Sequence, residues 1–193
     1  ADSMSAYAGV TAAASAYADM ESAVGAMAAG QVGVAIVHGA NPAYSMPEAS
    51  GFAEAFSQAA FKVSFASAMD ETAALADLIL PDRHFFEAWG DSMPRRGVMA
   101  LQQPVMQPVP HFDSKQAGDV LLAASTHLGN DLGAATFYEF MRNGHMEMHD
   151  ASMGDFETAW DQALRDGAVE HDTAMADSPP RLQSPDAALS FDA

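Results

Sequence analysis

Val32-Gly-Val-Ala-Ile-Val-His38 is a short apolar run, rich in β-branched residues, that ends at Gly39. Its length and composition are typical of a strand that is buried on both faces, as in a parallel sheet. Phe61-Lys-Val-Ser-Phe-Ala66 repeats the pattern, and Leu78-Ile-Leu80 is a third, shorter strand that Pro81 stops. These three runs decide the fold, because helical patterns separate them.

The helical patterns lie before and between the strands. Residues 1–30 are rich in alanine, carry apolar side chains every three or four positions, and end at Gly30. Residues 48–59 form a second helical pattern, and residues 70–76 form a short third one that Asp70 caps. Strands that alternate with helices predict an α/β fold with three layers, in which helices flank a largely parallel sheet. Ligands of such sheets bind beyond the carboxyl ends of the strands.

The pattern changes after Pro81. Residues 90–97 are rich in turn formers, and residues 101–110 form a proline-spaced extended run that we expect to pack against other parts of the chain. Two short amphipathic helices are predicted, at residues 119–128 and 155–165.

Three parts of the chain follow from these patterns. We expect an α/β domain over residues 1–130, a loop and helix extension over residues 131–170, and a tail over residues 171–193. The tail is rich in Asp, Ser, Pro and Ala and poor in large apolar residues, so we expect it to be disordered or wrapped on a partner. The fold class is therefore α/β with an irregular C-terminal extension.

The composition excludes several functions. The 193 residues hold 8 basic and 26 acidic side chains, a net charge of −18, with no basic run, which argues against nucleic-acid binding. The absence of cysteine excludes disulfides, zinc ribbons and thiolate-bound iron–sulfur clusters within these residues. No apolar run reaches the roughly 18 to 20 residues of a membrane helix, so we expect no direct membrane insertion.

The acidity has two explanations. In concentrated salt, charge repulsion is screened over roughly 3 Å at 1 M, so a strongly acidic surface costs little stability. Alternatively, an acidic surface docks a basic partner such as a cytochrome. The charge is spread over the whole chain, which favours a halophile-like habitat.

Several polar side chains have both a functional and a structural interpretation. His38, at a strand end, is a candidate acid–base group, but we expect a polar plug that is hydrogen-bonded to the following turn. Asp70, Glu71 and Asp77 are candidate paired carboxylates, although capping explains the first two. Arg95-Arg96 is the one basic pair, for which we expect an intramolecular ion pair rather than an anion site.

His145-Met-Glu-Met-His149 has spacing that a metal site could use. Its two histidines could share one helical turn, or both could lie with Glu147 on one face of a strand. A catalytic zinc site needs three protein ligands with supporting contacts, and no H-E-x-x-H pattern is present. We therefore expect a solvated loop here and no metal.

Three stretches carry a resemblance to a known family: Val37-His-Gly-Ala-Asn-Pro42, Phe61-Lys-Val-Ser-Phe65 and Asp70-Glu-Thr-Ala-Ala-Leu-Ala-Asp-Leu-Ile-Leu-Pro81. Together they resemble the molybdopterin oxidoreductase superfamily, the dimethyl-sulfoxide-reductase-like enzymes, and the E-T-A-x-x-A-D-x-x-L-P element is the most specific part. The resemblance implies a pterin dinucleotide near the G-x-N-P strand end and the E-T-A loop. Asn41, Glu71 and Thr72 are the positions nearest to such a cofactor.

The next stretch departs from that family. Members that bind the cofactor usually continue with a sequence similar to E-x-x-G-T-x-x-N-x-E-G-R, whereas this chain has Glu87-Ala-Trp-Gly-Asp-Ser-Met-Pro-Arg-Arg-Gly97, without the Thr and the Asn. Trp89-Gly-Asp91, Pro94-Arg95 and Gln102-Gln-Pro-Val-Met106 instead resemble the large iron–sulfur subunit of alternative complex III, a bacterial quinol-oxidising complex. In that subunit a molybdopterin-like domain persists without its cofactor. The likeness covers roughly residues 30–167.

This resemblance implies a non-catalytic scaffold segment of a membrane-associated quinol:electron-acceptor oxidoreductase in respiratory electron transfer. Its partners would be haem cytochromes and an integral quinol-binding subunit at the periplasmic face of the cytoplasmic membrane. We expect no cofactor in this segment and iron–sulfur clusters in the full-length chain. That family's subunit is much longer and has a cysteine-rich part, so we expect this chain to be a segment, with the export signal on a preceding portion.

Two alternatives stay open. The chain could be the cofactor-binding part of a molybdenum-dependent catalytic subunit of the polysulfide-reductase type, in which Asn41 and the Glu71-Thr72 loop bind the dinucleotide. The altered residues 87–97 argue against this enzyme. The other alternative is a free α/β binding domain unrelated to respiration.

Overall fold

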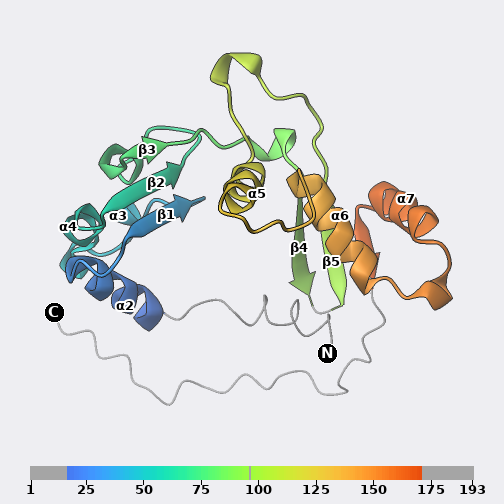
Figure 1. Cartoon of the computed structure of the whole chain (residues 1–193), viewed down its shortest axis with the longest axis horizontal. Coiled ribbons are helices and arrows are strands. Elements are labelled where there is room, and N and C mark those ends of the chain that lie inside the picture. The colour runs from blue at the N-terminus through green and yellow to red at the C-terminus, as the bar shows by residue number, and fades with distance from the viewer. Residues whose placement is uncertain (1–16, 96, 171–193) are drawn as a thin grey trace.

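The computed structural model describes residues 17–95 and 97–170. Figure 1 shows two lobes on either side of a central helix, α5 (Ala117–His127). One lobe is built on a first sheet, with strands β1 (Val34–His38), β2 (Phe61–Phe65) and β3 (Leu78–Ile79). The other is built on a second sheet, with strands β4 (Gly90–Arg95), β5 (Val98–Gln102) and β6 (Ala168–Glu170).

The first sheet has the strand order β1-β2-β3 and is parallel throughout. Helices α2 (Tyr17–Ala28) and α4 (Phe52–Ser57) cover one face, where the core cluster consists of Val24, Met27, Phe52, Ala55 and Phe56. Helix α5 covers part of the other face, because Ala117 packs against Val63 and Phe65 of β2. The predicted α/β fold, with helices flanking a parallel sheet, is confirmed.

Glycine shortens the helix predicted at residues 48–59. Gly51 has a φ of 61°, in the left-handed region that favours glycine. It separates a single 3₁₀ turn, Glu48–Ser50, from α4. The preceding loop also contains a short helix, α3 (Pro42–Ser45), in which Pro42 occupies the first turn, where its missing N–H costs nothing.

The helix predicted at residues 70–76 is only a 3₁₀ turn, Ala73–Leu75. The chain has too few residues for a longer helix, because β3 begins at Leu78. Asp70 Oδ1 accepts a hydrogen bond of 2.7 Å from the Ala73 backbone N–H, so its predicted capping role is confirmed.

The second sheet was not predicted. It is antiparallel with the order β4-β5-β6, and Met99 at its centre is almost completely buried. Residues 90–95, which we expected to be turn-rich, form β4 instead. The local pattern does not indicate this sheet, because β5 is completed by β6, a strand that lies after three further helices in the chain.

Three helices follow the first sheet. Helix α5 lies close to its predicted range. Helix α7 (Phe156–Asp166), which Asp155 caps and Gly167 follows, lies within one residue of the predicted 155–165. Helix α6 (Phe137–Met148) was not predicted, although the Thr136 and Glu139 side chains form a capping box at its start. The remaining 3₁₀ turns are Phe85–Glu87, Pro110–Phe112 and Ala151–Met153.

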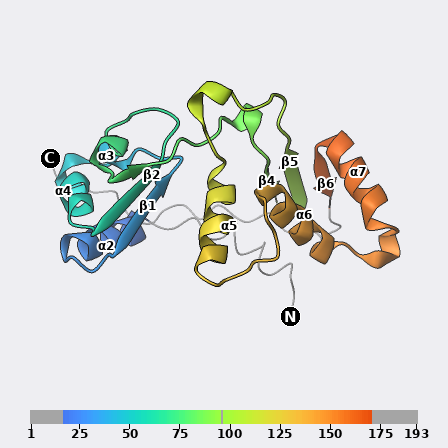
Figure 2. The ribbon, with the colours of Figure 1, turned by 45° about the horizontal axis from the view of Figure 1, so that its top comes forward.

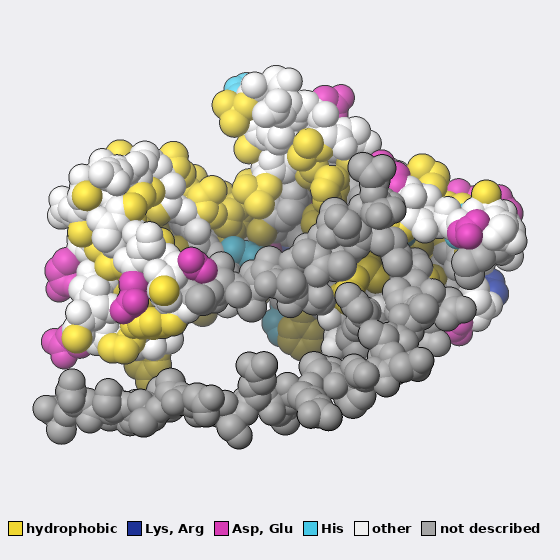
Figure 3. Space-filling view, turned by 90° about the horizontal axis from the view of Figure 1, so that it is seen from below, with side chains coloured by type: hydrophobic (Ala, Val, Ile, Leu, Met, Phe, Trp, Pro, Cys, Tyr) yellow, Lys and Arg dark blue, Asp and Glu magenta, His cyan; other side chains and the backbone are white. Residues whose placement is uncertain are grey.

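Charge is unevenly distributed on the surface. Figure 3 shows Asp and Glu side chains on both lobes of one face, whereas Lys and Arg are nearly absent from that face. In residues 17–95 and 97–170, no helix is both long enough and apolar enough to span a bilayer. The helix predicted before Tyr17 and the predicted tail at 171–193 lie outside the described residues, and the proposed domain boundaries stay predictions.

Candidate functional site

The loops after the three parallel strands surround a depression of about 320 Å³ at the carboxyl edge of the first sheet. Gly39, Asn41, Ala66 and Asp82 are among its lining residues, so each of the three strands contributes. This is the edge at which the parallel topology predicts a ligand.

The structure brings together Asn41, Glu71 and Thr72, the three residues that the resemblance indicates. Asn41 Nδ2 donates to Glu71 Oε2 at 2.6 Å, and Asn41 Oδ1 accepts from the Thr72 hydroxyl at 2.7 Å and from the Thr72 N–H at 3.2 Å. Thr72 is completely buried, and its hydroxyl oxygen also accepts from the Ala43 N–H at 3.0 Å. These residues, which we call the Asn41 cluster, fasten the loop after β1 to the loop after β2.

Glu71 carries a negative charge at neutral pH. The hydrogen bond from the Asn41 amide, and then one from its own backbone, holds the pKa of the exposed Glu71 carboxyl below its usual value. The Asn41 cluster therefore presents a carboxylate to solvent at this edge.

His38 contacts a residue across the sheet rather than in the following turn, so our prediction for it was wrong. Its Nε2 lies 2.6 Å from Oδ2 of Asp82, which follows β3, and its ring meets the edge of Phe65. The other Asp82 oxygen accepts from the backbone N–H groups of Arg83 and Ala117 at 2.9 Å each. The parallel register explains the contact, because it places the carboxyl ends of all three strands at one edge.

Asp70, Glu71 and Asp77 each have a different partner: the Ala73 N–H, the Asn41 amide and Lys62. Asp77 Oδ2 accepts from both the backbone N–H and the ammonium of Lys62, each at 2.8 Å. These contacts lower the pKa of the exposed Asp77 carboxyl. Asp77 thus supports the pairing of β2 with β3.

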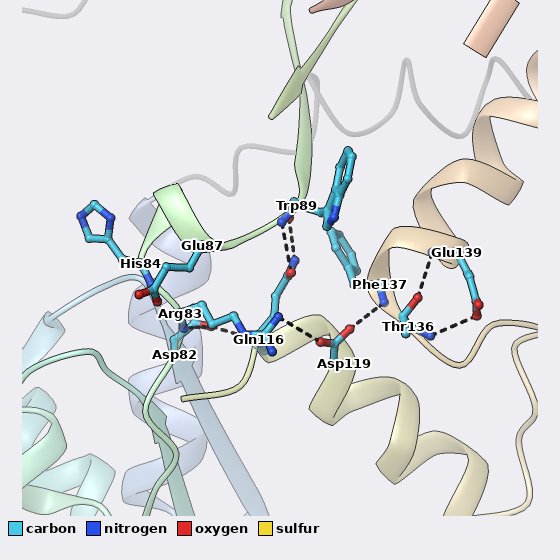
Figure 4. A network of polar contacts seen from close by, with 11 residues as sticks. Asp82, Arg83, His84, Glu87, Trp89, Gln116, Asp119, Thr136, Phe137 and Glu139 are labelled. Atoms are coloured by element: carbon cyan, nitrogen blue, oxygen red, sulfur yellow. Dashed lines mark hydrogen bonds and ion pairs between the residues drawn. The ribbon is translucent and has the colours of Figure 1, made fainter. Parts of the chain in front are cut away.

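A second set of polar contacts, which we call the joint network, connects the two lobes through α5 (Figure 4). Asp119 at the start of α5 accepts from the Phe137 N–H of α6 at 2.7 Å and lies 3.9 Å from the Arg83 guanidinium. Buried Gln116 makes two hydrogen bonds to the Trp89 backbone, accepting at 3.2 Å and donating at 2.6 Å. The network fixes α5 against both lobes.

Sequence reasoning did not identify the joint network. Two signals were available: Asp82-Arg83 follows the third strand directly, and Asp119 lies in the first turn of α5. Neither signal indicates Gln116, whose role depends on the distant Trp89.

His145 lies on α6 and is buried, so the prediction of a solvated loop was wrong for it. Its Nε2 is 3.3 Å from Asp91 Oδ2 on β4, close enough for an ion pair but without hydrogen-bond geometry. The ring also contacts Trp160 of α7. His149, by contrast, lies near the Gly154 carbonyl at 2.9 Å.

In the part of the chain that the structure describes, no three His, Asp or Glu side chains are placed to hold a metal. The expected ion pair of Arg95-Arg96 stays a prediction, because Arg96 and the Arg95 side chain lie outside what is described.

Residues 7–122, more than half of the chain, match the molybdopterin oxidoreductase family. The chain belongs to that family. A relative is the menaquinone reductase, molybdopterin-binding-like subunit of Nitratidesulfovibrio vulgaris (strain Hildenborough), which is 39% identical over 111 residues. The match covers 55% of this molybdopterin oxidoreductase chain and 16% of the relative, so the chain spans a small part of that relative's length.

The family implies a molybdopterin cofactor, whose dinucleotide form carries a negatively charged pyrophosphate. The depression is lined by the carboxylates of Asp70 and Asp82 and lies beside the carboxylate of Glu71. Among the described residues, Arg83 is the one cationic side chain that lines it, and it already lies near Asp119. In the Asn41 cluster, each amide group of Asn41 already has a protein partner. The residues present therefore do not fit the pyrophosphate.

Proposed function

We propose that this chain is a scaffold segment, without a molybdenum centre of its own, in the molybdopterin-binding-like subunit of a respiratory quinone oxidoreductase. The chemistry of the carboxyl edge carries the proposal. Two aspartates line the depression, Glu71 stays ionised beside it, and the amide of Asn41 is engaged within the protein. A negatively charged surface repels an anionic cofactor. The segment would therefore contribute its folded structure, rather than a cofactor site, to the assembly.

The joint network supports a scaffold role. A subunit that holds other proteins in fixed positions needs lobes that do not move relative to each other. Gln116 and Asp119 connect α5 to the loop before β4 and to α6, while the Ala117 N–H binds Asp82 of the first lobe. Each of these contacts is intramolecular and none requires a ligand.

The wider assignment rests on the relative from Nitratidesulfovibrio vulgaris. From its name we propose that the whole protein works with menaquinone or menaquinol in a membrane complex of the respiratory chain, as in alternative complex III. Haem cytochromes and an integral quinol-binding subunit are the partners that we propose, on the periplasmic side. Iron–sulfur clusters would belong to parts of the protein outside this sequence, because these residues hold no cysteine.

One observation favours the alternative, a cofactor-binding part of a molybdenum-dependent catalytic subunit. Arg83 lines the depression, and its Nε is buried without a hydrogen-bond partner. A buried donor without an acceptor is costly, by about 1–3 kcal/mol, and an anionic ligand would satisfy it. A single unsatisfied donor does not offset the repulsion between several nearby carboxylates and an anionic ligand.

Elemental mass spectrometry on the native assembly that contains this chain tests the proposal. We expect iron and less than a tenth of a molybdenum atom per copy of the chain. Stoichiometric molybdenum that co-purifies through size exclusion would contradict the scaffold role. As a matched control, an Arg83→Gln variant of the same assembly should leave the iron content unchanged, and a loss of molybdenum in that variant would support the alternative.

A further inference from the structure

The first sheet is incomplete at β1. Parallel sheets in α/β folds are normally covered on both faces, and their strands are buried. Val34 and Ile36 are nevertheless 57% and 53% exposed, and their neighbours on β2 and β3, Phe61 and Leu78, are 43% and 39% exposed. Within residues 17–95 and 97–170, β1 is an edge strand that pairs only with β2 (Figure 2).

The exposed apolar side chains lie on one face. Val34 is in register with Phe61, and Ile36 is in register with Val63, so these four side chains point to the same side of the sheet. Helix α5 packs on this side against Val63, but it leaves Val34 and Ile36 uncovered. Within the described residues, the edge of β1 therefore offers both unpaired backbone groups and an apolar face.

The helices on the opposite face indicate what should lie at that edge. Parallel strands joined by a helix form right-handed crossovers almost without exception. The crossover from β1 through α4 to β2 places α4 on one face and advances across the sheet from β1 towards β2. Any other crossover with its helix on this face must advance in the same direction.

Helix α2 lies on the same face as α4 and runs directly into β1. Val24 and Met27 of α2 form one core cluster with Phe52 and Phe56 of α4. A strand that leads through α2 into β1 must therefore lie on the side of β1 that faces away from β2. That side is the unpaired edge.

We propose that the free edge of β1 is paired by a parallel strand that precedes α2 in the same polypeptide and reaches β1 through α2 as a right-handed crossover. The chemistry of the edge defines this strand as short, uncharged and apolar on both faces. One face would meet α2, and the other would lie beside Val34 and Ile36. Residues 32–47 contain no Asp, Glu, Lys or Arg, although the chain has a net charge of −18.

A second copy of the chain fits this edge less well. It would bring together two molecules that each carry a charge of −18 and that repel each other at moderate salt. It would also leave α2 without the strand that its position in the crossover requires. The inference does not depend on the scaffold role, because it concerns sheet topology and would hold with or without a cofactor.

Amide hydrogen exchange followed by mass spectrometry tests the proposal. One sample is the polypeptide truncated to begin at Tyr17, and the other is the natural polypeptide with all the residues that precede Tyr17, purified as a single subunit. In the truncated sample we expect the β1 amides that face away from β2 to exchange quickly. In the natural polypeptide they should exchange roughly tenfold more slowly or slower still, since each is then hydrogen-bonded.

Strand β2 is the internal control, because it is the central strand and should be protected in both samples. Equal exchange of segment 34–38 in both samples would overturn the proposal. Protection that appears only when another subunit or a second copy is added would also overturn it. If truncation unfolds β2, the natural polypeptide alone decides: fast exchange of half of the β1 amides would contradict a paired edge. None of these outcomes depends on the metal content that tests the scaffold role.

Discussion

The two sheets differ in how the chain closes them. The first is parallel and built from consecutive strands, and the Asn41 cluster joins the loops after β1 and β2. The second is antiparallel and closed by β6, which follows α5, α6 and α7 in the chain. The strand pairing of the first lobe therefore lies within residues 34–79, whereas the second sheet forms only when residues 90–102 and 168–170 meet.

The difference shows where rigidity between the lobes has to come from. No strand of one sheet pairs with a strand of the other in residues 17–95 and 97–170. The joint network around Gln116 and Asp119 provides polar contacts between the lobes. The predictions below separate the contacts that hold one lobe from those that hold both.

The largest effect is expected at Thr72. Replacing it with Val keeps the volume but removes the hydroxyl that accepts from Ala43 and donates to Asn41. Because the site is completely buried, two polar groups lose a partner, and the free energy of unfolding should fall by about 2–4 kcal/mol. Urea denaturation followed by circular dichroism measures this. Thr72→Ser, which keeps the hydroxyl, is the control, and a loss below about 0.5 kcal/mol in Thr72→Val would refute the structural role of the Asn41 cluster.

A smaller effect is expected at Asp119. Asp119→Ala removes the acceptor for the Phe137 N–H and the ion pair with Arg83, and should lower the free energy of unfolding by about 1–2 kcal/mol. Because the joint network connects the lobes, the single unfolding transition should broaden or split in differential scanning calorimetry. The exposed Asp161→Ala on α7 should change stability by less than about 0.5 kcal/mol. Equal effects of the two variants would mean that the joint network does not couple the lobes.

Salt should stabilise both lobes. Acidic side chains lie on both of them, and the net charge of −18 gives repulsion that salt screens. We expect the thermal midpoint to rise by several degrees as sodium chloride increases from 0.1 M to molar levels. A midpoint that stays flat or falls would exclude the halophile-like interpretation of the acidity.

The smallest effect concerns pH. The lowered pKa of Glu71 means that its contribution to stability is fully present above the pKa of the unfolded state and is lost as pH falls through the folded-state value. Urea denaturation between pH 6 and pH 3, a range that spans an ordinary glutamate pKa of about 4.3, should show a shallower loss of stability in Glu71→Gln than in the wild type. Asp77→Asn, which removes another exposed carboxyl with a lowered pKa, is the matched variant. Identical pH profiles for wild type and Glu71→Gln would show that the Asn41 contact has no energetic role.

The first sheet could be predicted because each of its strands can be recognised from its own short stretch of sequence. Val32–His38 and Phe61–Ala66 are β-branched or aromatic runs of strand length, and Pro81 marks the end of the third. The grouping of Asn41, Glu71 and Thr72 came from the family resemblance, and the parallel register accounts for their proximity. Their mutual hydrogen bonds, which decide how the site is interpreted, depend on side-chain directions that spacing does not give.

The second lobe could not be predicted, because its strands and buried residues depend on contacts between residues that are far apart in the sequence. Strand β4 contains Pro94 and three turn-forming residues, which argue against a strand in the sequence. Strand β5 is buried only because it pairs with Ala168–Glu170. Helix α6 was missed although Thr136-x-x-Glu139 is a capping-box pattern in the sequence. The burial of His145 depends on Asp91 and Trp160, which lie on other elements of this lobe.

A titration of the chain with inorganic pyrophosphate tests the central claim, that the carboxyl edge of the first sheet does not hold an anionic cofactor. Isothermal titration calorimetry at 0.1 M salt should detect no saturable binding up to millimolar pyrophosphate, and the thermal midpoint should not change beyond the effect of ionic strength. Saturable binding that is lost in Arg83→Gln and kept in Asp161→Ala would contradict the claim and make the depression a ligand site.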